Sequence, residues 1–225
     1  MSGRANRLPF TVDLVILTAL ASQPTVLVEK GKSDGSRWAL PWGTVVRSET
    51  MVSVAERLSI TAVGARPAWI EQLGAFGDGR RHPSPAPLSV GFLAVVPHET
   101  ATLERGYHWF PARDLPQMTP RHRLMVDAAI TSLRMAVDRA PIAFRLLPER
   151  FTLTELQRMY ELLLGKPLHK ASFRRALQAA ALVEATDEWR SEGRGRPAQL
   201  YEFAPKRRRR TIRGVRFDLI GDRSV

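Results

Sequence analysis

The last third of the chain carries the pattern that most restricts its fold, a pair of short helices joined by a tight turn. Thr152 followed three residues later by Glu155 is a capping box, so a helix is predicted to start there and to run to Leu164. Gly165 ends this helix, and apolar residues at helical spacing predict a second helix over 170–181. The sequence therefore predicts a helix-turn-helix.

A β-hairpin is predicted directly after the second helix. Strand-like stretches at 183–189 and 198–203 flank a Gly-Arg-Gly-Arg-Pro loop at 193–197. A helix-turn-helix followed by such a hairpin is a winged helix, and the second helix of a DNA-binding helix-turn-helix enters the major groove.

The positive charge of the chain is concentrated in the same region. Of the net charge of +12, residues 141–225 contribute +8, with 18 Lys and Arg against 10 Asp and Glu, whereas residues 1–140 hold 16 against 12. A concentrated basic field attracts a phosphate backbone, because neutralised phosphates release their counterions. The alternative explanation is an Arg-rich surface that only keeps the protein soluble.

Composition removes several classes of protein. The chain has no cysteine, so disulfides, cysteine zinc sites and thiol nucleophiles are excluded. The five histidines are not expected to form a ligand cluster. No apolar run approaches the roughly 20 residues of a membrane-spanning helix, and the first residues lack the apolar core of a signal peptide. We therefore expect a cytoplasmic protein without membrane partners.

The first 140 residues alternate between strand-like and helix-like stretches. The expected strands are 12–20, 25–28, 69–76, 88–96 and 107–110, and the expected helices are 50–63 and 125–137. The length suits two domains, which we place at 1–140 and 141–225, the second ending in a basic tail. The fold class is expected to be α+β.

The segment Ala39-Leu40-Pro41-Trp42-Gly43 begins a stretch that resembles the signature of a Nudix domain. With the first glycine of that signature on Gly43, its first glutamate falls on Glu49, its arginine on Arg57 and its late glycine on Gly64, without a gap. The resemblance implies a Nudix-like α/β/α sandwich for residues 1–140.

The carboxylates that serve catalysis in this signature are absent. Leu58, Thr61 and Ala62 stand where the signature has glutamates. Cations such as Mg²⁺ need several oxygen ligands, commonly carboxylates, which leucine and alanine do not supply. We therefore expect no catalytic residues, no metal, no cofactor and no enzymatic activity.

Most of the chain resembles one family, the Nudix-related transcriptional regulators of bacterial NAD metabolism, or NrtR family. The resemblance rests on Arg37-Trp38-Ala39-Leu40-Pro41, Phe76-Gly77-Asp78, the run 89–97, Trp109-Phe110-Pro111, the run 147–157, Phe173-Arg174-Arg175 and the run 195–201. It implies a homodimer that represses NAD biosynthesis or salvage genes and leaves a palindromic operator when ADP-ribose or a related nucleotide binds. After Asp78 the chain departs from its relatives, with Arg81-His82-Pro83-Ser84-Pro85 where they often have Arg-Asp-Pro-Arg-Gly.

Candidate DNA-binding residues lie on three segments. The start of the second helix offers side chains to base edges, the glycine-flanked hairpin loop offers arginines to phosphates or the minor groove, and the run 206–210 offers further phosphate contacts. The candidates are Lys170, Ser172, Arg174, Arg175, Arg194, Arg196, Arg207 and Arg208. The alternatives are a solvated helix face, a flexible hairpin and a disordered tail.

Candidate effector-binding residues come from the Nudix-like part. Arginines suit the oxygens of a diphosphate, and a tryptophan suits stacking on adenine. The candidates are Arg37, Trp42, Glu49, Arg57, Asp78 and Arg81. The alternatives are core packing for Trp42 and an internal ion pair for Glu49 with Arg57. His82, His108 and His122 have no metal-ligand spacing and are expected to be incidental.

The function predicted from these features is a DNA-binding repressor of NAD genes that is controlled by an ADP-ribose-type nucleotide. One alternative is a Nudix hydrolase with a relocated catalytic base. Glu49 and Glu56 are the carboxylates left around the signature helix, with Glu71 and Asp78 as further sources. The other alternative is an accessory protein that binds nucleotide or RNA without operator specificity.

Overall fold

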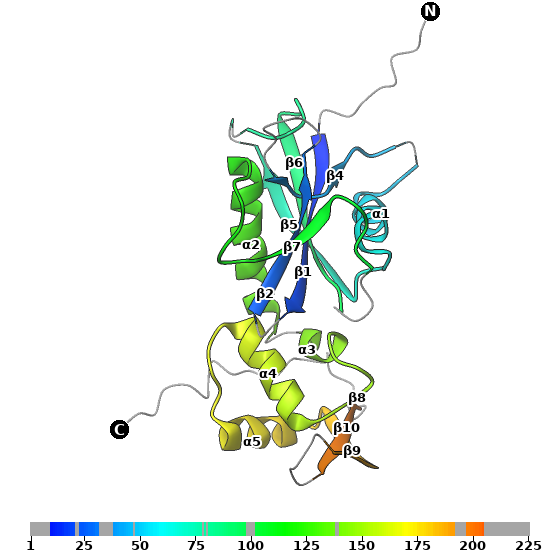
Figure 1. Cartoon of the computed structure of the whole chain (residues 1–225), viewed down its shortest axis with the longest axis vertical. Coiled ribbons are helices and arrows are strands. Elements are labelled where there is room, and N and C mark those ends of the chain that lie inside the picture. The colour runs from blue at the N-terminus through cyan, green and yellow to red at the C-terminus, as the bar shows by residue number, and fades with distance from the viewer. Residues whose placement is uncertain are drawn as a thin grey trace, which may run out of the picture. The chain divides into compact units, whose positions relative to one another are not determined.

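The structure is a computed structural model that describes residues 10–20, 23–31, 38–46, 48–77, 79, 81–97, 102–137, 140–191 and 197–204. The chain forms two compact units, Met1–Ser132 and Leu133–Val225, called unit 1 and unit 2 below and both visible in Figure 1. None of the described helices combines the length and apolar character that crossing a bilayer requires.

Unit 1 is built on a mixed sheet with β1 (Phe10–Leu20) at its centre. β2 (Gln23–Lys30) pairs with β1 antiparallel, and β6 (Leu88–Val95) pairs with it in parallel. The order is β3-β2-β1-β6-β5, with β4 paired to β1 and β7 paired to β2. These other strands are β3 (Trp38–Ala39), β4 (Trp42–Gly43), β5 (Trp69–Phe76) and β7 (Tyr107–Pro111).

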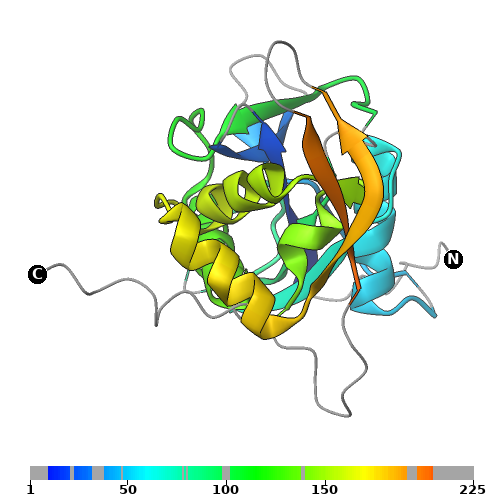
Figure 2. The same cartoon turned by 90° about the horizontal axis from the view of Figure 1, so that it is seen from below.

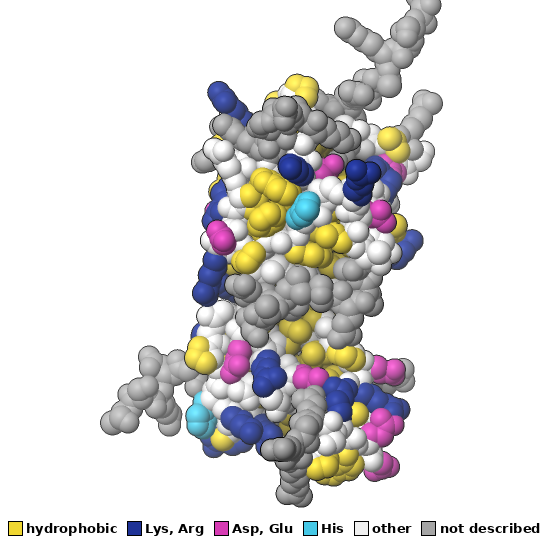
Figure 3. Space-filling model, in the orientation of Figure 1, with side chains coloured by type: hydrophobic (Ala, Val, Ile, Leu, Met, Phe, Trp, Pro, Cys, Tyr) yellow, Lys and Arg dark blue, Asp and Glu magenta, His cyan; other side chains and the backbone are white. Residues whose placement is uncertain are grey.

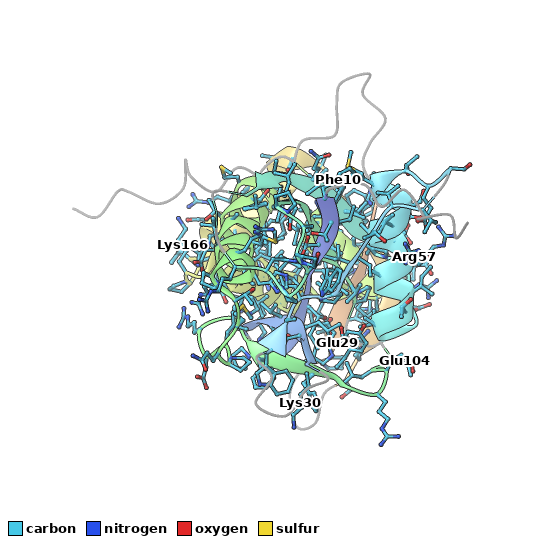
Figure 4. All side chains as sticks on the ribbon, turned by 90° about the horizontal axis from the view of Figure 1, so that it is seen from above. Phe10, Glu29, Lys30, Arg57, Glu104 and Lys166 are labelled. Atoms are coloured by element: carbon cyan, nitrogen blue, oxygen red, sulfur yellow. The ribbon has the colours of Figure 1, made fainter. Side chains whose placement is uncertain are left out.

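Successive side chains of β1 point to opposite faces of the sheet, so they pack on different helices. Val12, Leu14 and Ile16 are fully buried in a core that also holds residues of α1 (Met51–Val63). Thr11 and Asp13 point to the opposite face, which α2 (Pro120–Val137) covers in Figures 1 and 4. Helices on both faces of the sheet make the expected α/β/α sandwich.

α1 is bounded by the residues that the sequence suggests. Thr50 caps its first turn, because its hydroxyl accepts a hydrogen bond from the Ser53 amide at 3.1 Å. Gly64 ends the helix in the left-handed conformation, with φ of 66°, which a residue with a Cβ adopts only at a cost.

Unit 2 contains the predicted winged helix. Its helices are α3 (Ile142–Arg145), α4 (Leu153–Leu164) and α5 (Lys170–Ala180), and its sheet has the order β8-β10-β9. The strands are β8 (Arg150–Phe151), β9 (Val183–Arg190) and β10 (Ala198–Phe203). Figure 2 shows the two helices and the hairpin from below. A cluster of aromatic rings fills this unit, formed by Phe144, Phe151, Tyr160, Phe173 and Phe203.

Four differences from the predicted elements have a common cause. The sequence did not predict four elements that are only two to four residues long, too short for a periodic pattern to reveal them: β3, β4, β8 and α3.

α2 begins at Pro120, five residues before the predicted start at Met125. Its first turn carries Arg121 and His122, which are buried polar residues and therefore do not follow the apolar period.

Candidate DNA-binding surface and effector pocket

The predicted reading helix, α5, separates an apolar face from a basic one. Phe173 and Leu177, one helical turn apart, are each 1% exposed and fix the helix to the core of unit 2. Lys170, Arg174 and Arg175 are exposed. Three of the predicted DNA-binding side chains are therefore free of the core, on the helix that follows the turn.

The other DNA-binding candidates are placed differently. Ser172 is half-buried, and its hydroxyl lies 3.3 Å from Nδ1 of His169. Arg194, Arg196, Arg207 and Arg208 lie outside the described residues, so their roles stay predictions. On the side of unit 2 that Figure 3 shows, Lys and Arg side chains in dark blue lie among acidic side chains in magenta.

The effector candidates fall into two groups within unit 1. Trp42 and Arg81 belong to the α2 face of the sheet, beside a pocket of about 450 Å³ that Arg81 and His82 help to line. Trp42 is half-buried and meets the His82 ring edge-on, with the ring centroids 5.3 Å apart. Arg37 and Asp78 lie outside the described residues.

Glu49, which precedes α1, and Arg57, in the middle of α1, form the second group. Arg57 donates from Nε to one carboxylate oxygen of Glu49 at 2.7 Å and from a terminal nitrogen to the other at 3.0 Å. Figure 4 shows Arg57 on α1, on the side of the sheet opposite α2. The ion pair expected as the alternative role of these residues is therefore present, and a ligand contact from them stays a prediction.

Arg121 supports the pocket wall and was not a candidate. It is 3% exposed, and its guanidinium donates to the carbonyls of Ala86 and Pro87 at 3.0 and 3.1 Å and to the Ser89 hydroxyl at 3.4 Å. A buried guanidinium that binds two successive carbonyls fixes the path of the loop before β6. The sequence shows only one arginine among many, so no signal distinguished it.

The expectation that the histidines are unclustered is wrong. His82 and His122 converge on Asp13, and one ligand-type atom from each of the three lies within 4.8 Å of the others. Their Nε2 atoms lie 2.6 and 2.9 Å from Oδ1 of Asp13, and the Thr11 hydroxyl donates to Oδ2 at 2.6 Å. The side chains of Asp13, His82 and His122 are at most 1% exposed. Spacing along the chain could not show this, because residue 13 lies far in sequence from residues 82 and 122.

The backbone decides which nitrogen of each ring carries the proton. Nδ1 of His122 accepts from the Leu40 amide at 3.1 Å, and Nδ1 of His82 accepts from the Ser84 amide at 2.9 Å. Each neutral ring therefore carries its proton on Nε2 and donates it to Asp13. A metal on Nε2 would require a proton on Nδ1, facing an amide N–H. The arrangement suits a hydrogen-bonded carboxylate better than a cation site.

The charges of this network follow from its burial. Burial raises the pKa of Asp13, but hydrogen bonds from His122 and His82 outweigh it and hold the pKa of the carboxyl well below its ordinary value. Burial lowers the pKa of His122, although its hydrogen bond to Asp13 acts in the opposite sense. These shifts favour an ionised Asp13 carboxylate that accepts a hydrogen bond from a neutral His122.

We expect unit 1 to lose stability as the pH falls below about 6.5, because folding lowers the pKa of His122 from that value. The unfolded chain then binds more protons than the folded one, so this stability is present above pH 6.5 and is lost on acidification. The loss is about 1.4 kcal/mol for each unit by which folding lowers the pKa. Asp13 adds a loss of the same sign below its ordinary value of 3.8.

Urea unfolding measured from about pH 7.5 down to about pH 5 tests this dependence. His122→Gln keeps a hydrogen-bond donor without an imidazole, so its profile should be flatter than that of the native protein. An equally flat profile for the native protein would contradict the expectation.

A Nudix-like sandwich that has lost three glutamates of its signature, joined in one chain to a winged helix, defines a class of protein in which an enzyme fold accompanies a DNA-binding fold. Residues 143–203 match the NrtR DNA-binding winged helix domain. The ADPR responsive transcriptional repressor NtrR of Acinetobacter baylyi is 30% identical over 211 residues, covering 86% of this chain and 81% of that protein. The chain belongs to the NrtR family.

Solved structures agree with both units. The crystal structure of Shewanella oneidensis NrtR complexed with a 27mer DNA matches with a TM-score of 0.76 and 28% identity, over 93% of this chain and 99% of that one. A MutT/nudix family protein from Enterococcus faecalis matches with a TM-score of 0.69 and 22% identity, over 87% of each chain, and supports the fold alone. The predicted fold class and family are thereby confirmed.

Proposed function

We propose that this chain is a homodimeric repressor of NAD biosynthesis or salvage genes, which binds a palindromic operator through unit 2 and leaves it when an ADP-ribose-type nucleotide binds unit 1. The observation that carries the proposal is the basic face of α5, where Lys170, Arg174 and Arg175 are exposed beside a hairpin. The Acinetobacter baylyi relative bears the name of an ADPR-responsive repressor. Work on chromosomal DNA would place the protein in the cytoplasm.

Within unit 2, the three segments are proposed to act differently. Lys170, Ser172, Arg174 and Arg175 would read bases in the major groove. Arg194, Arg196, Arg207 and Arg208 would bind phosphates. The DNA-binding part would begin at Pro141, where the sequence pattern changes, although the compact units divide at Leu133 within α2.

Within unit 1, we propose the pocket on the α2 face as the effector site. Arg81 is exposed and lines this pocket. Trp42 packs against His82, which also lines the pocket. Arg37 and Asp78, which lie outside the described residues, are further proposed ligand contacts. A nucleotide diphosphate suits the arginines, and the adenine suits an aromatic ring.

We also propose that unit 1 does not hydrolyse its ligand. Leu58 and Ala62 are buried in the core between α1 and the sheet and carry no oxygen that could bind a metal. Glu49, the remaining carboxylate of the signature, is engaged by Arg57. These observations favour the regulator over the hydrolase with a relocated base.

One experiment tests the repressor and the absence of hydrolysis together. The protein is titrated onto a duplex from the promoter beside its own gene, and ADP-ribose with Mg²⁺ is then added. We expect selective binding, release of the duplex, and recovery of intact ADP-ribose. Equal binding to a scrambled duplex would favour the accessory nucleotide- or RNA-binding protein. Metal-dependent AMP formation that Glu49→Gln abolishes would establish the hydrolase.

A further inference from the structure

The outer half of the β9–β10 hairpin has little apolar packing to hold it. Most side chains of β9 are exposed, including Trp189, which is 56% exposed. The ladder also shifts register, since Tyr201 pairs with Ala185 but Gln199 pairs with Trp189. This bulge redirects the outer half of the hairpin. At the bulge, the Leu200 carbonyl accepts a hydrogen bond from the Thr186 hydroxyl at 3.0 Å.

Two Arg–Glu pairs connect this outer half to the rest of unit 2, one to α4 and one to β8. Arg190, the last residue of β9, donates to Oε1 of Glu155 in α4 at 2.8 Å and to the carbonyl of Arg150 in β8 at 3.2 Å. Arg150 in turn pairs with Glu188. β10 lies between β8 and β9 in the sheet. The contacts of Arg150 in β8 with Glu188 and Arg190 in β9 therefore cross over β10.

Glu155 has a second role that makes it a firm anchor. Its Oε2 accepts a hydrogen bond from the Thr152 amide at 2.7 Å, while the Thr152 hydroxyl accepts one from the Glu155 amide at 3.1 Å. This is the capping box of α4, so the carboxylate is already held at the start of a helix. The end of β9 is thereby tied to the first turn of the helix-turn-helix.

We infer that Arg190 and Glu155 are positioning residues for DNA binding, which hold the described strands of the hairpin at one angle to α4 and α5. The inference rests on the proposed DNA-binding function. The guanidinium of Arg190 is bonded to Glu155 and to the Arg150 carbonyl, so its loss acts on the position of β9 rather than on a DNA contact of its own.

Glu155→Gln distinguishes this role from a direct one, because the two predict effects of opposite sign. Glutamine keeps the capping box but pairs more weakly with Arg190. If the pair positions the hairpin, the variant binds the promoter duplex two- to fivefold more weakly, as the worth of an exposed ion pair suggests. If Arg190 instead binds phosphate, the variant frees a cation beside the DNA and binds more tightly. Tighter or unchanged binding overturns the inference.

Four further variants complete the design. Glu184→Gln removes the same charge as Glu155→Gln, but from an exposed position on β9, and its binding should not weaken. Arg190→Gln should match Glu155→Gln, and the double variant should be no weaker than either, since both remove one interaction. Arg190→Lys should restore part of the affinity. The slope of log affinity against log salt should flatten by about one to two phosphate contacts in the weak variants.

A measurement without DNA separates this inference from the proposed function. Trp189 lies in the outer half of the hairpin, so the NMR relaxation of its indole reports on the mobility of that half. Mobility should rise in Glu155→Gln while the melting temperature hardly changes. Unchanged mobility overturns the inference even if the protein binds DNA, and increased mobility supports it even if the native protein binds none.

Discussion

Asp13→Ala should lower the free energy of unfolding of unit 1 by about 3 to 5 kcal/mol, the largest loss expected from a single polar side chain here. The substitution leaves the Nε2 protons of His82 and His122 and the Thr11 hydroxyl without their acceptor in a fully buried site. Each unsatisfied buried donor costs about 1 to 3 kcal/mol, and Thr11 can recover part of its loss through Ser89, 2.8 Å away.

Asp13→Asn is the matched control for this prediction. Its carbonyl oxygen can accept from both histidines, and its amide can donate to Thr11 once that hydroxyl turns to Ser89. It should therefore lose much less stability than Asp13→Ala at neutral pH. Urea unfolding followed by fluorescence measures both variants, since unit 1 contains Trp38, Trp42, Trp69 and Trp109. Equal losses for the two variants would show that charge, and not hydrogen bonding, dominates.

Arg175→Ala should abolish the preference of the protein for its operator over other sequences. A bidentate contact between arginine and a base is worth about 1 to 3 kcal/mol of discrimination, which is roughly 5- to 150-fold in relative affinity. Arg175 is exposed on α5, so its removal should change the stability of unit 2 by less than about 0.5 kcal/mol. Gel-shift titration against specific and scrambled duplexes measures the ratio.

Arg207→Ala combined with Arg208→Ala provides the contrasting case. Residues that bind phosphate weaken binding to all sequences and flatten its salt dependence, but they leave the specificity ratio unchanged. If Lys170→Ala, Arg174→Ala and Arg175→Ala all bind the operator like the native protein, α5 is not the reading helix.

The sequence predicted the parts of this protein that depend on local pattern. The capping box at Thr152 and Glu155 located α4, and the glycine at position 64 located the end of α1. The ion pair of Glu49 with Arg57 followed from the spacing of a known signature. Each of these features joins residues that are close in the chain or tied to one motif.

The network around Asp13 could not be derived in the same way. His82 and His122 reach Asp13 from a loop and from the first turn of α2, and no period in the sequence connects them. One signal was present, because Asp13 interrupts an apolar, β-branched run. A carboxylate in a buried strand needs partners, so its presence predicts nearby donors although it does not name them.

The parallel pairing of β1 with β6 determines when unit 1 can complete its core during synthesis. β1 and β2 are neighbours in the chain and form a hairpin early, but β6 begins only at Leu88 and His122 follows later still. Until those segments leave the ribosome, the Asp13 carboxylate has water instead of its histidine donors and β1 has one unpaired edge. Contacts of such sequence separation slow folding. The Nudix-like unit therefore cannot complete the contacts of β1 and Asp13 until the start of α2 has been synthesised.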